Sequence, residues 1–159
     1  MSDDASGAPA ESFGEWGPPV SVRVERSAVW AFARAVCDDD PRFASGAGLV
    51  PPTFSVAWLH SCAVPSSSGT VPSLIPPGAD LFRRGAAPHG VFLHGEQGFT
   101  FHRPVEVGAV LEGRMRVGEP VEKRSSRGTM VVTRVQTRWT EDGAPVVTDE
   151  ATYILLLSD

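Results

Sequence analysis

Residues 129–157 have the sequence TMVVTRVQTRWTEDGAPVVTDEATYILLL. In the first half, residues that favour strands recur at every second position from Val131 to Trp139, which is the period of a strand with one buried face. The tripeptide Glu141-Asp142-Gly143 contains the Asp-Gly signal of a tight hairpin. The second half alternates at first and becomes fully hydrophobic over residues 153–157, which predicts a strand buried on both faces. This stretch therefore predicts two long antiparallel strands joined by a hairpin.

The preceding residues show the same two-residue period near 91–101 and 111–117. An earlier strand is predicted at 20–24, where three valines alternate with polar residues. A helix of about three turns follows it, because the hydrophobic residues from Val29 to Val36 have helical spacing and an Asp-Pro pair disfavours helical geometry soon afterwards. The order predicts a single α+β domain. In it, a meander of four long antiparallel strands follows one strand and one helix, and the helix can cover a sheet face.

Two segments lack the hydrophobic content of a packed core. Residues 1–15 are predicted to form a flexible N-terminal tail, anchored near Trp16, so the folded domain spans 16–159. The long connection at about 65–90 is rich in Pro, Gly and Ser, and two interpretations stay open: a functional lid or binding loop, or a disordered insertion. Residues 53–64 predict a regular element, but their pattern does not distinguish a helix from a strand.

The composition argues against several functions. Lys and Arg number 14 against 19 Asp and Glu, a net charge of −5, whereas a nucleic-acid partner needs a basic face. No window approaches the roughly 18 consecutive apolar residues of a membrane helix, and no secretory signal is visible, so a cytoplasmic location without a membrane partner is expected. Cys37 and Cys62 lack CxxC spacing and are expected to be buried free thiols. No phosphate-binding glycine loop is present, and no cofactor is expected.

An acidic run, residues 38–40, lies at the C-terminal end of the predicted helix, where the helix dipole disfavours negative charge. One carboxylate could act as a general base or contact a ligand. Alternatively, the run is a solvated turn in which Asp40 caps the segment that begins at Pro41.

A second candidate pair lies in the strand predicted near 91–101. His94 and Glu96 are two residues apart and are expected to share a face, opposite that of Phe99 and Phe101. A carboxylate beside an imidazole can orient it for proton transfer, although the same pair could form a structural hydrogen bond. A metal site would need a third ligand, which the sequence does not provide.

Three motifs resemble one known family. Residues 32–43, FARAVCDDDPRF, resemble the acidic segment of MaoC-like hydratases and dehydratases. Residues 93–104, LHGEQGFTFHRP, resemble a motif of the N-terminal, dehydratase-like half of that superfamily, and residues 51–54, PPTF, match a motif that usually stands between the two. The resemblance covers about residues 14–157. It implies a hot-dog fold, in which a curled antiparallel sheet wraps around a helix, and two such units commonly pair.

The resemblance also implies a function. In catalytic members the acidic segment provides an Asp and, a few residues later, a His, which together activate water or remove a proton next to a thioester. Asp38 matches that Asp, but Phe43 stands at the position of the His, and a phenyl group cannot transfer a proton. The chain therefore resembles the non-catalytic, acyl-binding subunit of a two-chain (R)-3-hydroxyacyl-thioester dehydratase or enoyl-thioester hydratase. Its ligand would be an acyl thioester of coenzyme A or of acyl carrier protein, and its partner a catalytic hot-dog chain.

The residues expected to bind the acyl ligand are Phe43, Phe54, Trp58, Gly95 and Gln97. Two alternatives stay open. In the first, a self-sufficient homodimeric hydratase, dehydratase or thioesterase uses Asp38, His94 and Glu96 as a relocated catalytic site. In the second, the protein binds an acyl ligand without turnover.

Overall fold

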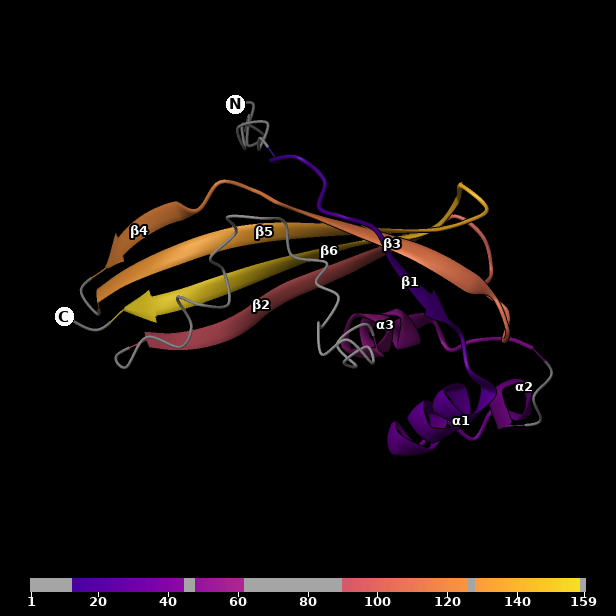
Figure 1. Ribbon diagram of the computed structural model, residues 1–159. Coiled ribbons are helices and arrows are strands. Elements are labelled where there is room, and N and C mark those ends of the chain that lie inside the picture. The colour runs from indigo at the N-terminus through magenta and orange to yellow at the C-terminus, as the bar shows by residue number, and fades with distance from the viewer. Residues whose placement is uncertain (1–12, 45–47, 62–89, 126–127, 158–159) are drawn as a thin grey trace, which may run out of the picture.

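The computed structural model describes residues 13–44, 48–61, 90–125 and 128–157 (Figure 1). In chain order the elements are β1 (Val20–Arg23), α1 (Arg26–Ala35), α2 (Pro41–Ala44), the 3-10 helix η1 (Pro52–Phe54), α3 (Ser55–Ser61), β2 (Gly90–Phe101), β3 (Val110–Val117), β4 (Val121–Ser125), β5 (Gly128–Glu141) and β6 (Ala144–Leu157). The predicted α+β class is confirmed, and residues 53–64, left open between helix and strand, contribute most of η1 and all of α3.

The hairpin predicted from residues 129–157 is present. Strands β5 and β6 are antiparallel along nearly their whole length, from Thr129 opposite Leu157 to Glu141 opposite Ala144. Asp142 and Gly143 form the turn with φ angles of 51° and 79°, and positive φ at both central residues is what an Asp-Gly hairpin turn requires. This hairpin forms the centre of a sheet with the order β1-β3-β5-β6-β2, in which β4 also pairs with β5.

The predicted meander is wrong for β2, which pairs with β6 and not with the next strand along the chain. The edge of β3 that faces away from β5 pairs with β1, so β2 cannot occupy it. Residues 102–109 connect the two edges, and the Gly108 N–H donates to the Val24 carbonyl on the way. As a result β2 is the last strand of the sheet, and among the described strands only β6 pairs with it.

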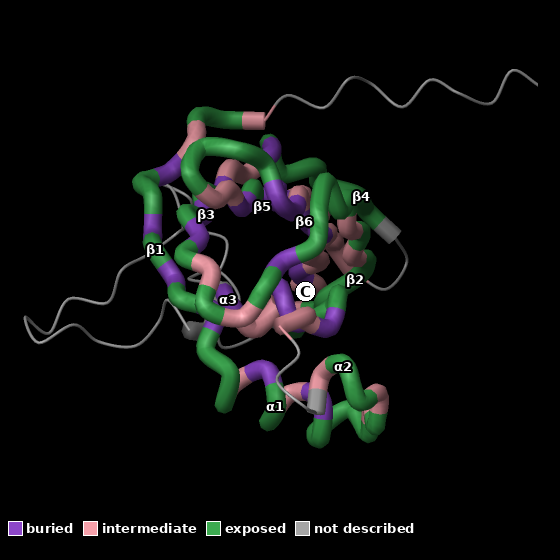
Figure 2. Tube along the Cα trace, turned by 90° about the vertical axis from the view of Figure 1, so that its right-hand side faces the viewer, coloured by how far each residue is buried: buried purple, intermediate pink, exposed green. Residues whose placement is uncertain are grey.

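The sheet is curled, and buried residues occur along its strands (Figure 2). On its inner face, Trp139 of β5 is fully buried and packs edge to face against Trp58 of α3, with ring centroids 5.3 Å apart. Gly113 of β3 lies opposite Trp139, and the indole covers it closely. The curled sheet around α3 is the hot-dog arrangement that the resemblance implied.

Helix α1 does not have the role expected of it. The sequence allowed this helix to cover a sheet face, but α3 packs on Trp139, while α1 places Phe32 against Phe54 of η1. A short connection from β1 keeps α1 beside the end of the sheet (Figure 1). Among the described helices, none is long and apolar enough to span a bilayer.

Cys37 follows α1 in a left-handed conformation, with φ of 56°. The turn exposes its side chain, so the expectation of a buried thiol is wrong for this residue. Cys62 lies outside the described residues.

The segment around Trp16 lies along β3, on the same edge as β1. The Gly14 and Gly17 N–H groups donate to carbonyls of β3, at 2.9 and 2.7 Å. Guanidinium groups of Arg116 and Arg138 lie over the Trp16 ring, 4.6 and 5.0 Å from its centroid. The predicted anchor is therefore present; residues 1–12, most of the predicted tail, lie outside the described residues, as does the connection 62–89.

Candidate functional site

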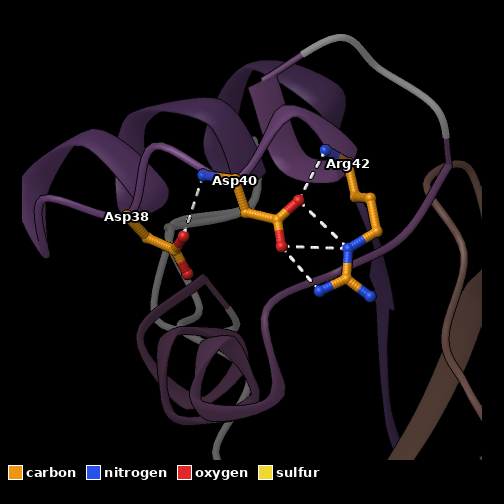
Figure 3. A network of polar contacts seen from close by, with 3 residues as sticks. All are labelled: Asp38, Asp40 and Arg42. Atoms are coloured by element: carbon orange, nitrogen blue, oxygen red, sulfur yellow. Dashed lines mark hydrogen bonds and ion pairs between the residues drawn. The ribbon is translucent and has the colours of Figure 1, made fainter.

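The acidic run after α1 is an ordered turn (Figure 3). Asp38 Oδ1 accepts a hydrogen bond from the Asp40 N–H at 3.1 Å. The Asp40 carboxylate accepts the Arg42 N–H at 2.9 Å and the Arg42 guanidinium at 2.6 to 3.0 Å. These hydrogen bonds from Arg42 lower the pKa of Asp40, so its carboxyl remains ionised. The capping interpretation of Asp40 is correct, and Arg42 compensates the negative charge that the helix dipole disfavours.

The same turn contributes to a cavity of about 580 Å³. Three segments line it: Arg42 and Phe43, residues 49–52 and, from the other end of β2, residues 101–105. Most of the wall is hydrophobic, contributed by Phe43, Leu49, Val50, three prolines, Phe101 and Val105. This volume and this character are typical of pockets for small organic ligands.

The polar residues of the cavity wall have partners within the protein. Arg42 is held by Asp40, as described above. Arg103 donates to Glu141 at 2.6 Å, and His102 Nε2 lies 3.0 Å from Thr148 Oγ1. Phe43 therefore shares the cavity with a histidine, but that histidine comes from the end of β2 and is fixed to β6.

The expectation that His94 and Glu96 share a face is wrong, because a β-bulge lies between the two residues. His94 lies opposite Tyr153, and Glu96 lies opposite Thr152. Adjacent residues of a strand point to opposite faces, so His94 is on the inner face and Glu96 on the outer face. A Cβ atom on Gly95 would lie 3.1 Å from Ile154 Cδ1 and 3.2 Å from the Thr152 carbonyl, so a side chain would crowd the bulge.

Because of the bulge, His94 is on the same face as Gln97 and the buried Asp149 of β6, which is only 3% exposed. Gln97 Nε2 lies 3.1 and 3.0 Å from the two carboxylate oxygens of Asp149 and donates to them. Burial raises the pKa of Asp149, and its hydrogen bond with Gln97 only partly opposes this. Burial likewise raises the pKa of Tyr153, whose ring contacts the His94 ring at 5.2 Å between centroids.

The residues selected from the sequence thus do not form one site. Phe43 lines the cavity, and Asp38 lies in the acidic turn beside it. His94 and Gln97 face inward on β2, while Glu96 faces outward. Phe54 and Trp58 are 3% and 2% exposed and pack in the core.

Sequence reasoning missed three residues of this region: His102, Arg103 and Asp149. The first two belong to the motif at residues 93–104, from which no role for them was predicted. Asp149 was detectable, because it shares the parity of Val147 and Ala151 in a strand whose alternation was recognised. Among the residues that the structure describes, no three or more His, Cys, Asp or Glu side chains lie close enough to hold a metal ion.

Comparison with known proteins identifies the family. The model of the FAS1-like dehydratase domain region matches residues 11–149. A UPF0336 protein of Saccharopolyspora erythraea is 30% identical over 149 residues, which cover 88% of this chain and 85% of that protein.

Two solved complexes from Mycobacterium tuberculosis contain similar chains. A chain of the HadBC complex, a 3R-hydroxyacyl-ACP dehydratase, is 26% identical with a TM-score of 0.60, and the match covers 92% of this chain and 98% of that one. A chain of the ChsH1–ChsH2 complex is 17% identical with a TM-score of 0.69, and the match covers 91% of this chain and 85% of that one. This similarity shows that the two chains share a fold. The match to the family model extends over most of the chain, from the segment around Trp16 to Asp149 of β6, so this hot-dog protein belongs to the FAS1-like dehydratase domain family.

Proposed function

We propose that this chain is the acyl-binding, non-catalytic subunit of a two-chain (R)-3-hydroxyacyl-thioester dehydratase or enoyl-thioester hydratase. In this role it binds the acyl chain of a coenzyme A or acyl-carrier-protein thioester. A second hot-dog chain, with an intact Asp and His, carries out the proton transfers.

The observation that carries the proposal is the position of Phe43. Its ring forms part of the cavity wall in the turn where the catalytic members of the resembled family have a histidine. A phenyl ring has no titrating group, and the loss of one acid/base group removes about 10²- to 10⁴-fold in rate. Asp38, the other half of the pair, already accepts the Asp40 N–H.

The cavity itself supports an acyl ligand. Apart from Arg42, His102 and Arg103, its lining residues are hydrophobic. An apolar wall suits an alkyl chain, whose burial contributes about 0.8 kcal/mol for each methylene group. Among the charged lining residues, the two arginines are ion-paired with Asp40 and Glu141 and need no anionic ligand.

The exposed side of β2 supports a partner chain. This strand of 12 residues ends the sheet, and its edge residues Val91 and Leu93 are 56% and 41% exposed. A long hydrophobic edge strand is a liability that proteins usually cover. A second hot-dog chain would cover it by pairing along β2, and similar chains occur in the HadBC and ChsH1–ChsH2 complexes.

The alternative is a self-sufficient enzyme, and His102 is the observation that favours it. This histidine lines the same cavity as Phe43, and an imidazole can transfer a proton. The relocated site of Asp38, His94 and Glu96 has less support, because His94 and Glu96 face opposite sides of the sheet.

The test is the hydration rate of crotonyl and longer enoyl thioesters by the purified chain alone. The proposal predicts a rate near background that does not change in Asp38→Asn, His94→Ala or His102→Ala, with folding checked by circular dichroism. A lone chain that is active and loses about 10²-fold or more in His102→Ala would support the self-sufficient enzyme and refute the proposal.

A further inference from the structure

The inner face of the sheet carries polar residues where an all-hydrophobic wall would be expected. Two cross-strand rows of this face consist of hydrophobic residues. One row contains Trp139, Val147 and Phe101, and the other contains Val131, Leu155 and Phe92. Three rows lie between these two, and in them Val135, Ala151 and Phe99 are interspersed with polar residues. We call these polar residues the polar strip and define it as Thr133, Thr137, Asp149, Tyr153, His94 and Gln97. The strip runs from β5 across β6 to the sheet edge at β2.

The strip extends from the buried interior to solvent. Thr133, Thr137 and Asp149 are 2 to 3% exposed. Gln97 is half-buried, and His94 on the edge strand is exposed. The exposed end of the strip is therefore at the β2 edge, where the proposed partner would pair.

Asp149 is the unusual member of the strip. A buried carboxylate has several acceptor positions, and burial is costly unless donors satisfy them. Among the side chains that the structure describes, Gln97 is the one that donates to Asp149, through a single nitrogen. Asp149 therefore keeps acceptor capacity that the described side chains do not use.

We propose that Asp149, oriented by Gln97, accepts a hydrogen bond from the hydroxyl group of a hydroxyacyl ligand. The inference rests on the proposed function, because it assumes that the chain binds an acyl thioester. It adds a specificity determinant: the inner face distinguishes a 3-hydroxyacyl chain from a saturated or enoyl chain of the same length.

The discrimination follows from hydrogen-bond chemistry. A hydroxyl group donates to the carboxylate, whereas saturated and enoyl chains have no donor at this position and leave the carboxylate unsatisfied. A hydrogen bond to a charged group favours the hydroxylated ligand by about 10- to 100-fold. The raised pKa of Asp149 is consistent with a carboxyl group that lacks donors in the free protein.

The test compares the dissociation constants of (R)-3-hydroxydecanoyl-pantetheine and decanoyl-pantetheine by calorimetry. The wild-type chain should bind the hydroxylated probe about 10-fold or more tightly. Asp149→Leu should bind both probes within about threefold of each other, and Asp149→Asn, which keeps size and a neutral acceptor, should reduce the preference to a few fold. Glu150→Gln is the matched control, because it changes an acidic side chain of β6 on the outer face and should keep the preference.

The outcomes separate the two proposals. Equal binding of both probes by the wild type would overturn the hydroxyl site and leave the acyl-binding function intact. Equal weakening of both probes in Asp149→Asn would assign Asp149 a purely structural role and also overturn the hydroxyl site. Binding of neither probe would overturn the acyl-binding function itself.

Discussion

Replacement of Gly113 by alanine tests the packing that holds α3 on the sheet. Gly113 lies opposite Trp139 in the β3–β5 pairing. A Cβ atom built there would lie 2.4 Å from Cζ3 of the indole, and 2.7 Å from both Cε3 and Cη2. Carbon atoms in contact prefer about 3.5 to 4.0 Å, so the indole must retreat by about 1 Å. Because Trp139 is fully buried and packs on Trp58, this movement disturbs the contact between the sheet and α3.

The expected cost has two parts. Overpacking of a well-packed core costs about 1 to 3 kcal/mol. Disturbing the edge-to-face pair of Trp58 and Trp139 adds up to about 1 kcal/mol. We therefore expect Gly113→Ala to lower the free energy of unfolding by about 1 to 4 kcal/mol, which corresponds to a fall in the urea midpoint of about 0.5 to 2 M.

Urea denaturation followed by tryptophan fluorescence measures this cost. Gly98→Ala is the matched control, because Gly98 also lies in a strand and has no atom within 4 Å of the added Cβ position. Trp139→Phe removes the benzo ring that meets the new methyl group, so it should be less harmful in the Gly113→Ala background than in the wild type. Equal midpoints for Gly113→Ala and Gly98→Ala would refute the argument.

Three further predictions concern other parts of the molecule. Burial raises the pKa of Asp149 in the folded protein above the unfolded value of about 3.9, so the folded state binds this proton more tightly. Relative to Asp149→Asn, the stability of the wild type should therefore rise as the pH falls from 7 through the raised pKa. Urea titrations at several pH values measure this dependence, and they would show the opposite slope if folding stabilised the ionised carboxylate. Trp16→Ala removes the ring that Arg116 and Arg138 cover and should lower the unfolding free energy by about 1 to 2 kcal/mol; an unchanged urea midpoint would show that the anchor is not stabilising. Phe43→His restores a titrating group beside the acidic turn and should give the lone chain measurable enoyl hydration that Asp38→Asn removes, whereas hydration that persists in the double variant would show that Asp38 is not its partner.

The strands were predictable because their side chains alternate. The period from Val131 to Trp139 and the Asp142-Gly143 turn are local properties, and the structure confirms both. The pairing of β2 with β6 was not local, since it depends on β1 occupying the edge of β3.

The candidate site was predictable in part. The position of Phe43 followed from a resemblance, and the structure adds the cavity that it lines. The bulge at Gly95 was invisible to a strict two-residue period, so the sequence paired His94 with Glu96. The contact of Gln97 with Asp149 joins residues 52 positions apart, and no local pattern could have revealed it.

Reconstitution with a catalytic partner tests the central claim most directly. The measurement is the hydration rate of an enoyl thioester at a fixed concentration of a co-purifying hot-dog chain that has an intact Asp and His, titrated with this chain. If this chain is the acyl-binding subunit, it is inactive alone, and the rate on long-chain thioesters rises with its concentration and saturates at one copy per partner. A partner whose rate on long-chain thioesters is unaffected by this chain, or a lone chain as active as the mixture, would contradict that claim.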